Sequence, residues 1–469
     1  MSTSLFRVHE HVLPCQHIRQ YPRATAGEQE DVLHLSIKQY TPLSNPNPRP
    51  GDVTIIGGHA NGFPKVSTPG PYVSVDLNLI LDCVQELYEP LWDELLKRTE
   101  KSSFRIRGIW IADVAHQGAS GVLNEGKLGN DPSWYDHPRD LLHMVNHFRS
   151  QMPRPLIGIG HSMGGNNLVN LSLMHPRLLE TLVLIDPVIQ RFSNVMGNHL
   201  PAQASAFRRD LWPSRAAAAA SYKKSAFYRA WDPRVLDLWL KHGLRDLPTE
   251  LYPSTTNLPT SSVPVTAEPT VTPEPPEEKQ VTLTTTKHQE VFTFLRPKPS
   301  LDPSTTSATS SSYNRLTHPD VTPLENPQAP FYRPEPIITF HNLPFLRPSV
   351  LYIFGTESPM SAPEFRAEKM ATTGTGVSGS GGAAEGRVKE VVMEGVGHLI
   401  PMERVKETAE ACKEWIGAEM GRWREQEEKE RKEWRDLPKE EKIRLSEKNL
   451  ELLGGLEGLE RRAVRKEKL

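Results

Sequence analysis

The sequence has few cysteines, little net charge and no long apolar run. Its cysteines, Cys15, Cys83 and Cys412, lie far apart and are odd in number, which argues against a disulfide framework and a Cys-x-x-Cys zinc site. With 55 Lys and Arg against 57 Asp and Glu, no global field recruits nucleic acid or an anionic membrane. No stretch approaches the roughly 18 apolar residues of a spanning helix, and the first residues lack a signal-peptide core. We expect a soluble, unsecreted protein.

A segment from about residue 253 to 330 is dense in Pro, Ser and Thr. Such a segment cannot bury enough apolar area to offset the entropy of ordering it, so we expect it to be mobile. Within it, residues 280–297 are rich in β-branched and aromatic side chains. These residues predict a short strand or a clamp docked on the body of the protein.

The chain from about Glu403 onward alternates charge signs along a helical pattern that Pro438 interrupts. Its first turns carry an apolar stripe that can pack, formed by Ala409, Cys412, Trp415 and Ile416. The later turns are predicted to be solvated helix.

The remaining chain alternates apolar runs with helical patterns. Short β-branched runs predict strands at 52–60, 104–115, 155–162, 181–188, 349–356 and 388–398. Amphipathic spacing predicts helices at 89–99, 136–150 and 166–176. Near-continuous apolar strands are typical of a sheet that is covered on both faces. This order predicts an α/β fold with a mostly parallel, doubly wound sheet and right-handed crossovers.

The long interval between the strands at 181–188 and 349–356 predicts an inserted cap, with helical patterns between about Phe207 and Leu247. We expect four parts: a first core segment at 30–186, the cap at 187–346, a second core segment at 347–415 and the charged tail at 416–469. Aromatic residues of the cap form either its own core or an apolar wall for substrate: Trp212, Phe227, Tyr228, Trp231 and Trp239.

The stretch Gly160-His161-Ser162-Met163-Gly164 stands between a predicted strand and a predicted helix. In the pattern Gly-x-Ser-x-Gly, the glycines let the strand turn sharply into the helix, and the serine is left in a strained conformation above the sheet. The helix N-terminus beneath it offers unpaired N–H groups and a partial positive charge, which suit an oxyanion. We therefore predict that Ser162 is the nucleophile of an acyl-transfer site.

A serine hydroxyl needs a general base, because it is a poor nucleophile near neutral pH. His398 stands after the last predicted strand, behind a Gly-x-Gly turn that can swing its imidazole toward Ser162. The acid stays open between Asp186, at a strand end, and Glu357. Most proteins of this architecture carry the acid at the position that Ser358 occupies here. Geometry favours Asp186, although an Asp-Pro turn that merely ends the strand would look the same.

The loop after the strand that begins at residue 52 contains small residues, in the stretch GGHANGFPK. There the backbone N–H groups of Ala60 and Asn61 can approach a substrate and act together with that of Met163 as an oxyanion hole. We expect His59 and His161 to support the site, His59 by side-chain hydrogen bonds that hold the loop.

Four motifs together resemble the α/β-hydrolase superfamily: HANGFPK, GHSMGG, LIDPV and GVGHLIPME, in this order and spacing. The stretch 112–148 resembles a fungal branch that includes peroxisomal lipase-like hydrolases and hydrolases of toxin biosynthesis. The resemblance implies an α/β-hydrolase fold and a serine esterase, lipase or thioesterase. Such an enzyme acts on a small-molecule acyl substrate, with Ser162 as nucleophile and His398 as proton carrier. It requires neither a metal nor an organic cofactor.

A second hypothesis is a non-catalytic α/β-hydrolase scaffold that binds a small ligand or, through its charged tail, a protein partner. A fluorophosphonate discriminates the two hypotheses, because only an activated Ser162 forms a covalent adduct.

The sequence ends in Glu467-Lys468-Leu469. Relatives in peroxisomes end in tripeptides like Ser-Lys-Leu, and the last two residues match while Glu467 does not. We expect a peroxisomal import receptor as a partner and peroxisomal localisation; otherwise the protein is expected in the cytoplasm.

Overall fold

The computed structural model describes residues 4–61, 85–100, 102–192, 199–253, 279–298, 318–321 and 330–454. The chain forms two compact units, Met1–Gly417 and Ala418–Leu469. Cys83, most of the Pro/Ser/Thr-rich segment and the C-terminal tripeptide lie outside the described residues. Within the described ranges, no helix combines the length and apolar character needed to cross a bilayer.

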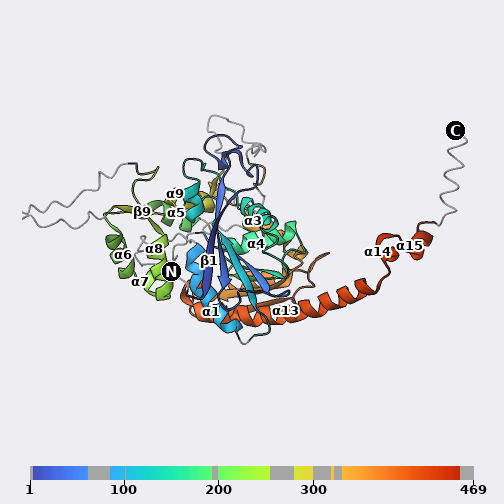
Figure 1. The fold of residues 1–469 in the computed structure, drawn as a ribbon. Coiled ribbons are helices and arrows are strands. Elements are labelled where there is room, and N and C mark those ends of the chain that lie inside the picture. Colours follow the sequence, from blue (N-terminus) through green and yellow to red (C-terminus); the bar gives the residue numbers. More distant parts are fainter. Residues whose placement is uncertain are drawn as a thin grey trace, which may run out of the picture. The chain divides into compact units, whose positions relative to one another are not determined.

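An eight-stranded sheet runs through the first unit (Figure 1), in the order β1-β2-β4-β3-β5-β6-β12-β13. Its strands are β1 (Phe6–Pro14), β2 (His34–Pro42), β3 (Val53–Gly58), β4 (Ile106–Ala112), β5 (Leu156–His161), β6 (Thr181–Ile185), β12 (Ser349–Gly355) and β13 (Val388–Met393). All pairs from β4 to β13 are parallel, whereas β2 is antiparallel to both β4 and β1. The predicted mostly parallel sheet is confirmed.

The sheet starts at Phe6, before the expected start of the core at residue 30. Strand β1 lies at the edge and most of its residues are exposed, so its sequence carries no apolar run. In contrast, every residue of β3, β5, β6 and β12 is buried. Burial on both faces explains why these strands are nearly continuous in apolar residues.

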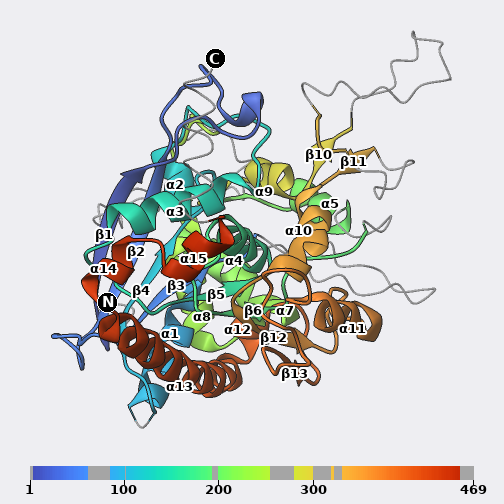
Figure 2. The same ribbon diagram turned by 90° about the vertical axis from the view of Figure 1, so that its right-hand side faces the viewer.

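Helices cover the sheet (Figures 1 and 2): α1 (Glu89–Thr99), α2 (Gly118–Leu123), α3 (Asp136–His147), α4 (Met163–Met174), α10 (Glu335–Asn342), α11 (Pro363–Thr372), α12 (Ile400–Glu403) and the part of α13 (Val405–Asp436) that belongs to the first unit. Residues of α3 and α4 pack with strand residues in one large apolar cluster, which includes Leu141, Leu168, Ile56 and Tyr352. This packing fixes the N-terminus of α4 at the end of β5, where the predicted nucleophile stands.

The interval between β6 and β12 contains the cap. Its described elements are α5 (His199–Phe207), β7 (Leu211–Trp212), α6 (Arg215–Lys224), α7 (Ala226–Arg229), α8 (Pro233–His242), β8 (Leu244–Asp246), β9 (Val281–Leu283), α9 (Lys287–Phe294), β10 (Arg296–Pro297) and β11 (Phe331–Tyr332). All five aromatic residues predicted for the cap are buried. Tyr228 packs against the rings of Phe227 and Trp231, so these residues belong to the core of the cap.

Residues 280–297, predicted as a strand or a docked clamp, form both a strand and a helix. Strand β9 lies between β7 and β8 in a small three-stranded sheet. Helix α9 follows, and the Thr286 side chain caps it by accepting a hydrogen bond from the N–H of Gln289 at 3.2 Å.

The apolar stripe predicted for the start of the tail is confirmed. Ala409, Cys412, Trp415 and Ile416 of α13 are all buried, and Trp415 Nε1 donates to Thr181 Oγ1 at 2.8 Å. Helix α13 ends at Asp436, two residues before Pro438, and the short helices α14 (Lys439–Ile443) and α15 (Glu447–Leu452) follow. Residues 428–436 are all exposed, as expected for solvated turns.

Candidate active site

Ser162 stands at a sharp turn between β5 and α4. Its φ is 57° and its ψ is −119°, a strained conformation for a residue with a side chain. The turn needs the glycines around it, since a Cβ on Gly164 would lie 2.2 Å from the carbonyl carbon of Gly58. Ser162 is fully buried, and its Oγ has no hydrogen-bond partner among the described residues. The backbone of Ser162 is therefore strained, and no described residue forms a hydrogen bond with its hydroxyl.

Asp186 and His398 meet beside this turn. Asp186 directly follows β6, the neighbour of β5, and its Oδ2 lies 2.5 Å from His398 Nδ1. The hydroxyls of Ser358 and Ser361 also donate to the Asp186 carboxylate. Burial acts to raise the pKa of Asp186, but the charge of His398 and these hydrogen bonds outweigh it and hold the pKa below its ordinary value. Asp186 is thus held as an anion against the imidazole of His398.

His161 ties the loop of His398 to the turn that carries Ser162. Burial lowers the pKa of His161 to about 3, so its ring is neutral. Its Nε2 lies 2.8 Å from the carbonyl oxygen of His398, which can only accept, so the proton is on Nε2. Its Nδ1 must then accept from the Tyr88 hydroxyl, at 2.9 Å. Because His161 directly precedes Ser162, this network brings the predicted base and nucleophile to the same end of the sheet.

Of the two acids left open by the sequence, Asp186 contacts His398. The Glu357 side chain is exposed, and the backbone N–H of this residue donates to the carbonyl oxygen of Val396 at 3.1 Å. Ser358, at the usual place of the acid, contributes a hydroxyl to Asp186 instead of a carboxylate to the histidine.

The loop after β3 is held by two side chains. His59 donates from Nδ1 to the Ala60 carbonyl at 2.9 Å and accepts from the Val114 N–H at 3.0 Å, and burial lowers its pKa to about 4. The Ala60 N–H donates to the Tyr88 hydroxyl at 3.0 Å, so this N–H is already engaged. Asn61 follows as the last described residue of the loop.

Met163 is the first residue of α4, where N–H groups have no partner within the helix. Its side chain belongs to a buried apolar cluster with Val114, Trp134, Val188 and Met360. An apolar surface therefore adjoins the predicted nucleophile.

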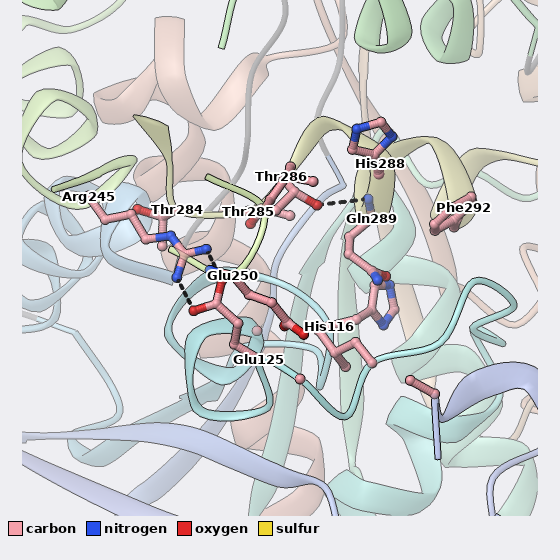
Figure 3. Close-up of a pocket in the computed structure, with 15 residues that line it drawn as sticks. His116, Glu125, Arg245, Glu250, Thr284, Thr285, Thr286, His288, Gln289 and Phe292 are labelled. Carbon is pink, nitrogen blue, oxygen red and sulfur yellow. Dashed lines mark hydrogen bonds and ion pairs between the residues drawn. The ribbon is translucent and has the colours of Figure 1, made fainter. Parts of the chain in front are cut away.

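A cavity lies against α9. Its volume is about 470 Å³, and Figure 3 shows His116, Gln289 and Phe292 in its lining. Arg245 and Glu125 also line it and form an ion pair, with Arg245 Nη2 2.5 Å from Glu125 Oε1. The described residues that line it include neither the predicted nucleophile nor the predicted base. Across the described ranges, no group of three His, Cys, Asp or Glu side chains is placed to hold a metal ion.

Four supporting residues were not found from the sequence. Tyr88, Gln117 and Lys369 carry no motif, and the partners of Tyr88 and Gln117 lie far away in the chain. Lys369 is fully buried and donates to the Met360 carbonyl at 3.3 Å, next to Ser361. Ser361 stands three residues after Ser358, and this proximity to the usual position of the acid was the one signal in the sequence that could have indicated it.

Comparison with known proteins settles the family. The family model described as "Alpha/beta hydrolase family" matches residues 87–411. The chain belongs to the α/β-hydrolase family. The type I acyl-CoA thioesterase mpaH of Penicillium roqueforti (strain FM164) is 42% identical over 96% of this chain and 95% of its own length. The type I acyl-CoA thioesterase mpaH' of Penicillium brevicompactum is 45% identical over 93% of each chain.

Among solved structures, the peroxisomal α/β-hydrolase Lpx1 of Saccharomyces cerevisiae is similar to the chain. It aligns with a TM-score of 0.58 and 16% sequence identity, over 89% of this chain and 91% of its own. At this identity the likeness concerns the fold alone.

Proposed function

We propose that this α/β-hydrolase cleaves an acyl thioester or ester through a covalent acyl-enzyme, with Ser162 as nucleophile, His398 as general base and Asp186 as acid. One observation carries the proposal: Asp186 Oδ2 lies 2.5 Å from His398 Nδ1, while His161 holds the His398 loop beside the strained Ser162. A serine, an imidazole and a carboxylate in this order are the parts of a triad.

In the first half-reaction, Ser162 Oγ attacks the acyl carbonyl as His398 Nε2 takes its proton. The Asp186 carboxylate stabilises the imidazolium that forms, and its own two serine donors keep it ionised. The carbonyl oxygen becomes an oxyanion, which the N–H groups of Met163 and Asn61 stabilise at the N-terminus of α4. The Ala60 N–H already donates to the Tyr88 hydroxyl, so in this proposal Ala60 does not bind the oxyanion and instead anchors the loop.

The tetrahedral intermediate then collapses, and His398 gives its proton to the leaving thiol or alcohol. In the second half-reaction, His398 activates a water that attacks the acyl-enzyme, and the carboxylic acid leaves. Ser162 regains its proton, so each turnover consumes one water.

We further propose an acyl-CoA as the substrate class. The support comes from two relatives at 42% and 45% identity, both named acyl-CoA thioesterases and aligned over more than nine-tenths of the chain. A buried apolar cluster beside Ser162 suits an apolar acyl group.

A fluorophosphonate reporter tests the nucleophile. We expect a single adduct on Ser162 that is lost in Ser162→Ala and retained in Ser172→Ala, a matched control with a buried hydroxyl on the same helix. A folded wild-type protein that neither reacts with the reporter nor hydrolyses p-nitrophenyl esters or acyl-CoA would favour the scaffold hypothesis.

Peroxisomal localisation through Glu467-Lys468-Leu469 also remains a proposal, and its support is the match of the last two residues to a known import tripeptide. A fluorescent protein fused to the N-terminus should co-localise with peroxisomes and become diffuse when Lys468 and Leu469 are deleted. Diffuse fluorescence of the intact fusion would exclude this import signal.

A further inference from the structure

We propose that the cap helix α9 positions the oxyanion loop, with Thr293 and Gln117 acting as positioning residues through Asn61. This inference rests on the proposed function, in which the Asn61 backbone N–H faces the oxyanion. Neither positioning residue needs to touch the substrate.

The Asn61 side chain is held at both ends. Its Oδ1 accepts from Gln117 Nε2 at 2.6 Å, and its Nδ2 donates to the Glu290 carbonyl on α9 at 3.4 Å. Gln117 Nε2 has two protons, and the second goes to Thr293 Oγ1 at 3.0 Å. A continuous path of hydrogen bonds therefore runs from α9 through Gln117 to the loop after β3.

The Thr293 hydroxyl fixes the direction of every bond in this path. It donates to the Gln289 carbonyl one turn earlier in α9, at 2.7 Å. Its two lone pairs then accept from Gln117 Nε2 and from His116 Nε2, the latter at 2.8 Å. Burial lowers the pKa of His116 to about 3, so its ring is neutral. Because the Thr293 hydroxyl gives its proton to the Gln289 carbonyl, the one proton of the ring must be on Nε2 to bond Thr293 Oγ1. One hydroxyl thus makes all three hydrogen bonds of which it is capable.

These groups are shielded from water. Thr293 is fully buried, and Asn61 and Gln117 are 1% and 2% exposed. Burial leaves little room for water to replace a lost partner, so removing one bond leaves a poorly satisfied polar group and shifts its neighbours. The two hydrogen bonds of the Asn61 side chain go to two different elements, α9 and the start of α2. Because both ends of the side chain are fixed, a shift of either partner also moves the Asn61 backbone.

Helix α9 is itself anchored on the face that reaches Asn61. Trp134 Nε1 donates to the Thr293 carbonyl at 2.8 Å, and Trp134 packs in the same apolar cluster as Met163. Arg208 Nη2 lies 3.0 Å from the buried Glu290 carboxylate. His288, Gln289 and Phe292 of α9 line the cavity of Figure 3, as does His116, the partner of Thr293 Oγ1. The contacts on the buried face therefore set the position of the helix.

The test compares three variants of buried threonines. Thr293→Val removes the hydroxyl, and Thr293→Ser keeps it. Thr408→Val is the matched control, because Thr408 is also buried and its Oγ1 also donates to the carbonyl four residues earlier, that of Arg404, at 2.6 Å. We expect Thr293→Val to lower kcat roughly tenfold with little change in KM, as for a displaced oxyanion donor. Thr293→Ser should regain most of this loss, and Thr408→Val should equal wild type.

The rate of reaction with a fluorophosphonate should fall by a similar factor, since its developing oxyanion needs the same donors. Circular dichroism and a thermal midpoint on each variant check that the proteins compared are folded. A Gln117→Met variant should lose more, and the double variant with Thr293→Val should lose no more than Gln117→Met alone, because both act along one path.

The inference is overturned if Thr293→Val and Thr408→Val have equal kcat, if KM alone changes, if serine does not restore kcat, or if the two substitutions are additive. An inactive wild type would instead overturn the proposed function.

Discussion

At the scale of single residues, the site depends on how Asp186 is kept charged while fully buried. Two serine hydroxyls and the His398 ring surround its carboxylate, and together they outweigh the cost of burial. Ser162 and His398 could be singled out from the sequence as candidates, because Gly-x-Ser-x-Gly and the late Gly-x-Gly-His are local patterns. The acid stayed open, because its choice depends on which strand end lies nearest to the imidazole.

Asp186→Asn should lower kcat by several hundredfold or more, because the amide does not stabilise the imidazolium and misorients the ring. Glu357→Gln should have no effect, since the Glu357 side chain is exposed. Steady-state turnover of an acyl-CoA measures both. Equal kcat values for the two variants would contradict the assigned acid.

The stability of the protein should also depend on Asp186. Its folded pKa lies below the ordinary value of 3.8, so its stabilising contribution is complete well above that pH and is lost as the pH falls through the folded pKa. The difference in unfolding free energy between wild type and Asp186→Asn should therefore shrink as the pH is lowered from about 5 toward 3. Urea titrations at a series of pH values measure it. A difference that grows on acidification would be inconsistent with a lowered pKa.

At the scale of elements, apolar runs predicted the buried strands and the helices between them. Strands β1 and β2 were missed, because β1 is an exposed edge strand without an apolar run, and β2 alternates buried and half-buried residues. The helix α9 was missed for another reason. Its β-branched and aromatic residues favour a strand, but the Thr286 cap and the contacts of Thr293 with the core make it helical.

The close approach of α4 to β3 predicts a severe effect of Gly164→Ala. The new Cβ would meet the Gly58 backbone at 2.2 Å, so one of the two elements must move, and we expect a loss of about 2–4 kcal/mol in unfolding free energy together with most activity. Gly417→Ala in the helix α13 is the control, since its Cβ would make only ordinary contacts, with Ser103 Oγ at 3.4 Å and ring carbons of Phe104 at 3.9 Å. It should stabilise by about 0.5–1 kcal/mol. Urea unfolding of both variants checks the pair, and similar changes would contradict this packing.

At the scale of the whole molecule, the site is assembled from distant parts of the chain. Ser162, Asp186 and His398 follow different strands, and the cap lies between the second and the third of them in sequence. Motif order and strand pattern were enough to predict the α/β fold, but they gave no information on which cap residue reaches which loop. That information resides in side-chain contacts, such as Gln117 with Asn61, whose partners share no local pattern.

The central claim is that an acyl group is carried on Ser162 during turnover. Mixing the wild-type protein with a long-chain acyl-CoA, quenching in acid within milliseconds to seconds and sequencing its peptides by mass spectrometry measures this directly. We expect the mass of the acyl group on Ser162 and none in Ser162→Ala. Two results together would contradict the account. The wild type would release thiol without any acyl group on Ser162 across the whole time course, and Ser162→Ala would release thiol at an undiminished rate.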